Sequence, residues 1–130
     1  MTIPFWCLFA VILIPVPLAM LGGYYRGKTF GQADNKNPRA QVARLEGIGA
    51  RTYAAQANAW EAAIVFTAAV LVSHLAGVSA ESATPWTLAF VVFRILHAIF
   101  YIMDIDKARS GAFLAAIACM IALFVKAGSV

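Results

Sequence analysis

The sequence predicts an all-α fold, a bundle of four helices that spans a membrane as a single domain over residues 1–130. Hydrophobic residues make up 62% of the chain and charged residues only 12%, whereas a soluble domain carries roughly a quarter charged residues. The mean hydropathy is +0.80. Four apolar segments lie at about residues 3–25, 50–75, 85–103 and 111–126. The first three are long enough to cross about 30 Å of hydrocarbon as helices, and the fourth is shorter but equally apolar.

The first segment, residues 3–25, is predicted to be a retained span and not a cleaved signal peptide. It has no basic region before its apolar run and no clear small-residue cleavage site. Pro15 and Pro17 are expected to kink the helix, because proline removes a backbone hydrogen bond and neighbouring helices can satisfy the freed carbonyl groups. Gly22-Gly23 permits a close helix approach or a bend near the membrane interface.

The long polar segment that follows is predicted to be an irregular loop to about Lys36 and then a surface helical turn from Pro38. Asn37-Pro38 is typical of a helix start, since proline at the first helical position loses no hydrogen bond. Gly47 and Gly49 predict a flexible joint before the second span.

The second span, residues 50–75, is rich in alanine, which lets helices pack closely in lipid. The third is expected to begin near Pro85-Trp86, a proline start with an interfacial aromatic residue. A compact charged turn at residues 104–110 leads into the fourth span, which begins at about Gly111.

The distribution of charge predicts how the bundle lies in the membrane. The formal net charge is +4, and the first and third connections hold most of the basic residues: Arg26, Lys28, Lys36, Arg39, Arg44, Lys107 and Arg109. The other side has only Lys126. The positive-inside rule therefore places loops one and three in the cytoplasm and both termini outside. Anionic lipid headgroups explain this charge better than nucleic acid does, since no basic-aromatic surface pattern is present.

The two cysteines, Cys7 and Cys119, lie singly in apolar segments and are expected to be small buried hydrophobic residues. No Cys/His spacing typical of a metal site occurs, so the sequence predicts no metal centre.

Polar side chains on two predicted spans are the main functional signal. Arg51 and Asn58 share one helical face of span two, with Glu61 on its flank. Buried polar and charged groups are costly in lipid unless partners satisfy them. Consecutive spans are antiparallel neighbours, so Arg94 of span three is expected to form an ion pair with Glu61.

His97 and Tyr101 lie three and seven residues after Arg94, on the same helical face. Two interpretations remain open for this set of polar residues. Either it locks the bundle together, or it lines a cavity for a polar ligand. The excess of polar groups over one ion pair favours the cavity.

Two residues have alternative interpretations. His97 is either a general base or a hydrogen-bonded structural residue. Arg109, followed by Ser110 at the start of span four, is either a cation that stabilises a thiolate or a positive-inside anchor.

The run Arg51-x3-Ala55-x2-Asn58-x2-Glu61 resembles the RxxxAxxNxxE stretch of the MAPEG family, the membrane-associated proteins of eicosanoid and glutathione metabolism. Arg94-x2-His97-x3-Tyr101, followed by Arg109-Ser110, is similar to the family's third helix and fourth-helix start, and Asn37-Pro38 matches its first loop. The resemblance covers nearly the whole chain. It implies a homotrimer of four-helix bundles that binds glutathione as a co-substrate between neighbouring subunits, near the cytoplasmic face.

The resemblance also implies roles for individual residues. Arg109 matches the arginine that activates the thiol, and Ser110 lies beside it; Arg51 matches the motif arginine, a structural or entrance charge. By position, the glutathione-contacting residues are Asn58, Glu61, His97, Tyr101, Arg109 and Ser110, with Arg94 in the same set. The chain departs from the family pattern at Ala40, Ala50, Ala54, Ala57 and Phe113, where members carry acidic, basic or hydroxyl-bearing side chains.

The resulting hypothesis is a glutathione-dependent transferase or peroxidase that acts on hydrophobic electrophiles partitioning from the bilayer. The composition is similar to a bacterial branch of the family, which implies an inner-membrane protein in contact with lipid. The alternative is a non-catalytic trimeric membrane protein whose polar cavity is structural or binds lipid. A channel or transporter is weaker, because the sequence has no internal repeat with interrupted helices.

Overall fold

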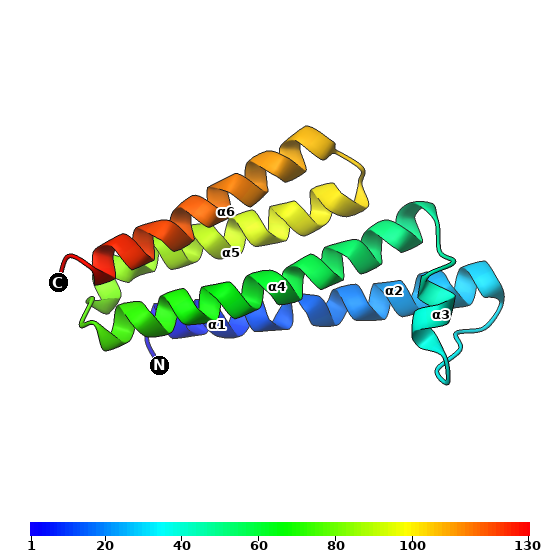
Figure 1. Cartoon of the computed structure of the whole chain (residues 1–130), viewed down its shortest axis with the longest axis horizontal. Coiled ribbons are helices and arrows are strands. Elements are labelled where there is room, and N and C mark those ends of the chain that lie inside the picture. Colours follow the sequence, from blue (N-terminus) through cyan, green and yellow to red (C-terminus); the bar gives the residue numbers. More distant parts are fainter.

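The computed structural model describes residues 1–130 and is all-helical, as the sequence predicts (Figure 1). Its helices are α1 (Ile3–Leu13), α2 (Pro15–Phe30), α3 (Pro38–Val42), α4 (Gly47–Leu75), α5 (Ala80–Ile102) and α6 (Asp106–Ala127). Because α1 and α2 form one span, four segments are long and apolar enough to cross a membrane: Ile3–Phe30, Gly47–Leu75, Ala80–Ile102 and Asp106–Ala127. The chain is therefore an integral membrane four-helix bundle.

The two ends of the bundle differ in charge. Both termini lie at one end in Figure 1, here called the terminal end. The loop at residues 31–37, α3 and the α5–α6 turn lie at the other, here called the basic end because it carries most of the arginines and lysines. Large hydrophobic side chains such as Ile64, Leu75 and Leu114 are exposed along the outside, where a membrane protein meets lipid.

The first span is interrupted at Ile14, one residue before Pro15. The Ile14 N–H donates to the Val11 carbonyl at 3.2 Å instead of making an α-helical bond. The helical hydrogen bonding is thus interrupted beside the prolines, while Ile14 keeps α-helical dihedral angles, and the span continues to Phe30 instead of ending at residue 25. Beyond the interruption, α2 packs mainly against α4, whereas α1 packs against both α4 and α5.

Gly22 on α2 meets α4 closely, as the sequence predicts. A Cβ atom placed on Gly22 would lie 2.8 Å from Cε2 of Tyr53, whereas one on Gly23 would meet nothing within 4 Å. Only the first glycine of the pair is therefore required for packing.

The flexible joint predicted at Gly47 and Gly49 is wrong, because both glycines belong to the first turn of α4. Gly47 has a φ of +56°, a conformation that glycine adopts without strain. Gly49 is buried against Leu45 and Tyr25, with a Cβ position only 3.1 Å from the leucine. These glycines begin the helix and pack it.

Two other predicted helix starts are also too late. The third span begins at Ala80, where the Ser79 hydroxyl caps the helix by accepting a hydrogen bond from Ser82 N–H at 3.2 Å. Pro85 therefore lies inside α5 and does not begin it. The fourth span begins at Asp106 and not at Gly111, which places Arg109 within the first turns of α6.

The interior is tightly packed at the terminal end and thinner at the basic end. A large apolar cluster includes Phe66, Phe90 and Leu123, with the two aromatic rings stacked 4.0 Å apart at 5°. The cluster toward the basic end consists of Leu18, Ala55, Ala59 and Ala98. Since alanines fill little volume, the helices at the basic end have less side-chain contact to hold them together.

Candidate ligand site

A buried arginine lies at the centre of the polar cluster in the bundle. Arg94 on α5 is only 3% exposed, and its guanidinium donates to Asn58 of α4 twice, to Oδ1 at 2.6 Å and to the backbone carbonyl at 3.2 Å. Asn58 Nδ2 in turn donates to Glu61 Oε2 at 3.2 Å. The three side chains form a chain of hydrogen bonds in which the amide links the two charges.

The predicted direct ion pair between Glu61 and Arg94 is therefore wrong. The single ion pair of the protein is Arg51 with Asp104, at 3.3 Å. Asn58 lies one helical turn before Glu61, and Arg94 bonds to Asn58. The Glu61 carboxylate is therefore connected to Arg94 only through the Asn58 amide. Arg94 and Glu61 are nevertheless linked through Asn58, and the nearby negative charge lowers the cost of burying the guanidinium.

This cluster lies on one side of a cavity of about 280 Å³ between α4, α5 and α6. Asn58, Glu61 and Arg94 provide the polar lining. The rest is apolar and comes from Ala62, Val65, Phe90, Phe113, Ala116, Ile117 and Met120. A mostly apolar cavity with a few converging polar groups is the usual form of a small-molecule site.

His97 and Tyr101 extend the polar face of α5 toward the basic end. His97 is 4% exposed, and its Nδ1 has no hydrogen-bond partner. Its ring packs edge-on against Tyr101, with centroids 5.6 Å apart, and lies 6.0 Å from the ring of Phe113. Tyr101 also contacts the guanidinium of Arg109, which lies 4.4 Å above its ring centroid. A continuous series of side chains thus leads from the cavity to Arg109.

Five predicted site residues do not line the cavity. Three of them, His97, Tyr101 and Arg109, lie beyond it toward the basic end, and the other two are Arg51 and Ser110. Arg51 lies at the basic end, where it bonds to the α5–α6 turn. Ser110 is exposed on α6, and its hydroxyl makes no hydrogen bond within the protein. The sequence spacing placed Arg51 on the same face as Asn58, but its long side chain extends toward the end of the bundle.

A second hollow, of about 540 Å³, lies between α2, α3 and α4. We call it the basic hollow, and its lining residues include Arg26, Arg39, Tyr53, Gln56 and Trp60. On α4, residues 53, 56, 57 and 60 point away from residues 58, 61, 62 and 65 at about 100° per residue, so the hollow and the cavity lie on opposite faces of that helix.

None of the residues that line the basic hollow was assigned to a site from the sequence, and Arg26 is the buried one among them. It is 8% exposed and donates to the Asp34 carbonyl at 3.2 Å and to Asn35 Oδ1 at 3.4 Å, while its Nε has no partner. In the sequence it counts only among the basic residues of the first connection, which the positive-inside rule explains. Only the folding back of loop 31–37 reveals that it is buried.

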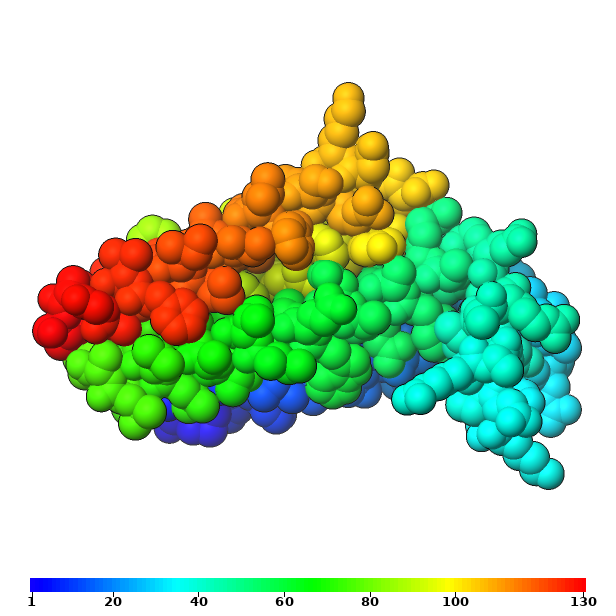
Figure 2. All heavy atoms as spheres, in the orientation of Figure 1, coloured from blue at the N-terminus to red at the C-terminus, as the bar shows by residue number.

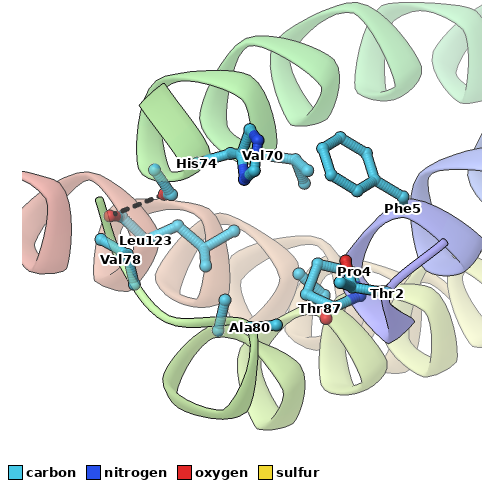
Figure 3. Close-up of a pocket in the computed structure, with 11 residues that line it drawn as sticks. Thr2, Pro4, Phe5, Val70, His74, Val78, Ala80, Thr87 and Leu123 are labelled. Atoms are coloured by element: carbon cyan, nitrogen blue, oxygen red, sulfur yellow. Dashed lines mark hydrogen bonds between the residues drawn. The ribbon is translucent and has the colours of Figure 1, made fainter. Parts of the chain in front are cut away.

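A third hollow, at the terminal end, contains none of the predicted site residues (Figure 3). Its volume is about 20 Å³, close to what a single water molecule occupies. Phe5 and His74 lie on the same side of it and pack edge to face, with ring centroids 5.0 Å apart. This hollow is too small for an organic ligand.

Fold and site together define a class: a four-span membrane bundle with a polar cluster on the wall of a cavity between its helices. The MAPEG family model matches residues 3–129, nearly the whole chain. The chain therefore belongs to the MAPEG family, as its motifs indicated. No curated protein and no solved structure matches it.

Proposed function

We propose that this protein is a glutathione-dependent transferase or peroxidase that acts on hydrophobic electrophiles dissolved in the membrane. The observation that carries the proposal is the cavity of about 280 Å³, in which the Arg94–Asn58–Glu61 cluster meets apolar walls within a MAPEG bundle. A polar thiol compound can bind at the polar lining while an apolar electrophile reaches the apolar side from the lipid.

Arg109 is the group proposed to stabilise the reactive thiolate. Its guanidinium is held over the Tyr101 ring, so its position is restricted although no carboxylate neutralises it. A nearby cation favours the thiolate form of a thiol, and the thiolate is the nucleophile. The sulfur then attacks the electrophilic carbon, and the leaving group departs with the bonding electrons. With a hydroperoxide, the sulfur attacks the terminal oxygen, the O–O bond breaks and the alkoxide leaves and takes up a proton as the alcohol. The sulfenic acid formed on glutathione then reacts with a second glutathione to give the disulfide and water.

A homotrimer is part of the proposal, because one protomer offers few free cations around its cavity. Arg94 is occupied by Asn58, and Arg51 is paired with Asp104. The basic hollow carries Arg26 and Arg39 on the opposite face of α4. In a closed ring the same two unlike faces meet at every interface. A neighbouring subunit's hollow would then supply the cations that the carboxylates of glutathione require.

We also propose that the basic end faces the cytoplasm of a bacterial cell and that the protein lies in the inner membrane. The concentration of arginine and lysine at that end supports this orientation. Glutathione would then enter from the cytoplasm.

The test is glutathione binding by the detergent-solubilised protein, measured by titration calorimetry. Saturable binding is expected, and Arg109→Ala is expected to weaken it at least about tenfold, since a hydrogen bond or ion pair to a charged ligand group is worth roughly 1.5–3 kcal/mol. Lys107→Ala is the matched control, because it removes the same charge from an exposed position two residues away. Absence of binding at millimolar glutathione would contradict the proposal.

One observation favours a second function, a non-catalytic trimer whose cavity is structural or holds lipid. The polar groups of Arg94, Asn58 and Glu61 largely satisfy one another, and the remaining cavity wall is apolar. In that case Arg94→Ala lowers stability, while Arg109→Ala leaves every measured property unchanged.

A further inference from the structure

Arg51 links two parts of the bundle at the basic end. From the second turn of α4, its Nε donates to the Ile102 carbonyl at 3.2 Å, and its NH1 group pairs with Asp104 Oδ2 at 3.3 Å. Both acceptors belong to the end of α5 and the turn before α6. No other side-chain hydrogen bond joins α4 to the α5–α6 hairpin until Arg94 and Asn58, seven residues further along α4.

The backbone at Asp104 is unusual for a residue with a side chain. Its φ is +64°, and it is the single non-glycine residue of the protein with a positive φ. The Ile105 N–H bonds back to the Phe100 carbonyl at 2.9 Å and the Asp104 N–H to the Tyr101 carbonyl at 3.3 Å, which is the pattern of a helix end where glycine is usual. An aspartate here accepts backbone strain that glycine would avoid, and its carboxylate is the group that Arg51 binds.

The surrounding architecture allows this end of the bundle to open. In Figure 1 the α5–α6 hairpin and the α2–α4 pair diverge toward the basic end, and in Figure 2 part of α5 (yellow) is visible between α6 (orange) and α4 (green). Packing is dense at the terminal end, where Phe66, Phe90 and Leu123 lie. At the basic end it depends on alanines. A hairpin held firmly at one end and thinly at the other can pivot about the firm end.

We propose that Arg51 and Asp104 form a turn latch, which sets the width of the gap between α4 and the α5–α6 hairpin and thereby controls the entry of polar solutes to the cavity. Closing the latch draws the turn toward α4 and positions α6, on which Arg109 begins the path to the cavity. The side chains of Arg51 and Asp104 are 30% and 67% exposed, so water can compete for both groups and the pair can open thermally. Arg51 is then a positioning residue that acts through the turn and does not touch the ligand.

That the admitted solute is glutathione rests on the proposed function. The proposed movement of the hairpin does not depend on that function. Both measurements that test the latch therefore leave glutathione out. A failure of the latch leaves the proposed binding intact, and a failure of glutathione binding leaves the latch intact.

The first measurement is the distance between spin labels on α4 and α6, by pulsed electron paramagnetic resonance on the full chain in lipid nanodiscs. The labels are placed on exposed residues, as Ile48→Cys and Lys107→Cys, in a background with Cys7→Ala and Cys119→Ala. Asp104→Asn removes the charge but tolerates the same backbone conformation, since asparagine adopts positive φ more readily than most residues. It is expected to give a longer and broader distance distribution than the parent.

The matched control is Asp106→Asn, which removes an equal charge from the same turn. The Asp106 carboxylate accepts one hydrogen bond, from the neighbouring Lys107 N–H at 2.8 Å, and forms no ion pair, so this control should leave the distribution unchanged. Molar salt should shift the parent toward the Asp104→Asn distribution, because it screens an exposed pair. Identical distributions for the parent and Asp104→Asn would overturn the proposal.

The second measurement tests entry itself. A cysteine introduced as Phe113→Cys on the cavity wall is exposed to a charged maleimide that does not cross lipid. Loss of the latch should raise the rate of modification about threefold, the range that one exposed ion pair allows, and Asp106→Asn should not. An unchanged rate in Asp104→Asn would contradict control of entry even if the label distance had moved.

Discussion

At the scale of single residues, the bundle shows how an amide makes a buried charge tolerable. Arg94 is 3% exposed, yet it reaches no carboxylate within ion-pair distance. Asn58 accepts from the guanidinium and donates to Glu61, so it transmits the negative charge across one helical turn. Removal of one partner from such a network costs more than the net value of the bond, because the other partner stays buried without its acceptor.

Asn58→Ala is expected to destabilise the protein by about 2 kcal/mol, the cost of leaving a buried charged donor without its main acceptor. Thermal unfolding in detergent, followed by circular dichroism, measures the loss. Gln56→Ala is the matched control, since this half-buried amide on the same helix makes no hydrogen bond within the protein. Equal stability of the two variants would show that the Arg94–Asn58 bond contributes nothing.

Asp34 organises the loop beside Arg26. Its carboxylate accepts hydrogen bonds from the backbone N–H groups of Asn37 and Lys36, at 3.1 and 2.8 Å, and these bonds lower the pKa of Asp34 below its ordinary value of 3.8. A depressed folded-state pKa means that the stabilisation is present above pH 3.8 and is lost as the pH falls through the folded-state value.

Hydrogen exchange therefore should find the Lys36 and Asn37 amides protected at neutral pH, with protection lost in strong acid. In Asp34→Ala the same amides should lack protection at every pH. Protection that persists in the variant would mean that the Asp34 carboxylate is not needed and that Arg26 and Gln41 order the loop. The Gln41 side chain accepts from Asp34 N–H at 2.9 Å and donates to the Gln32 carbonyl at 2.8 Å.

At the scale of elements, the contact between α2 and α4 depends on one glycine. The Tyr53 ring occupies the space in which a side chain on Gly22 would lie, while the neighbouring Gly23 faces open space. Close packing of this kind is how helices associate in lipid, where no hydrophobic effect drives them together. The same tyrosine lines the basic hollow, so this contact also shapes that face of the bundle.

Gly22→Ala is expected to destabilise the protein by about 1–3 kcal/mol, because the added methyl group must displace the Tyr53 ring. Gly23→Ala should be neutral or stabilise by up to about 1 kcal/mol, since alanine favours the helix over glycine. Unfolding temperatures of the two variants provide the comparison. A loss in both would indicate that the bend at the pair, and not the close approach, is what matters.

At the scale of the whole molecule, the cavity and the basic hollow lie on opposite faces of α4. That arrangement suits a ring of subunits, in which unlike faces meet, and not a twofold dimer. The exposed Trp60 side chain, 47% accessible, is on the hollow side and would be covered by a neighbour.

Native mass spectrometry of the protein in detergent is expected to give a trimer of 13.9 kDa protomers. Trp60→Ala should shift the population toward monomers, because aromatic residues near the centre of an interface often carry much of its binding energy. Trp86→Ala is the control, an exposed tryptophan on α5 outside the hollow. A monomeric parent protein would contradict the trimer, and with it the completion of the site by a second subunit.

Much of this architecture could be predicted from the sequence because it depends on local chemistry. Segment lengths and hydropathy determine that four helices cross the membrane, and Asn37-Pro38 marks the start of α3 correctly. The family match over residues 3–129 confirms the family that these motifs indicated. Helix starts were less predictable from the sequence. Several residues could cap α5 and the sequence alone does not show that Ser79 does so, nor does it show that Gly47 adopts a positive φ at the start of α4.

The sequence by itself thus determined the helical membrane bundle and the polar faces of its second and third spans, since both follow from periodicity and from the cost of polar groups in lipid. Only the tertiary structure decided how those polar groups pair. Arg94 binds Asn58 and not Glu61, and Arg51 binds the α5–α6 turn and not the cavity. The physical reason is that a long side chain bonds to whichever acceptor the helix packing brings within about 3 Å, and helical spacing specifies only the face from which it starts.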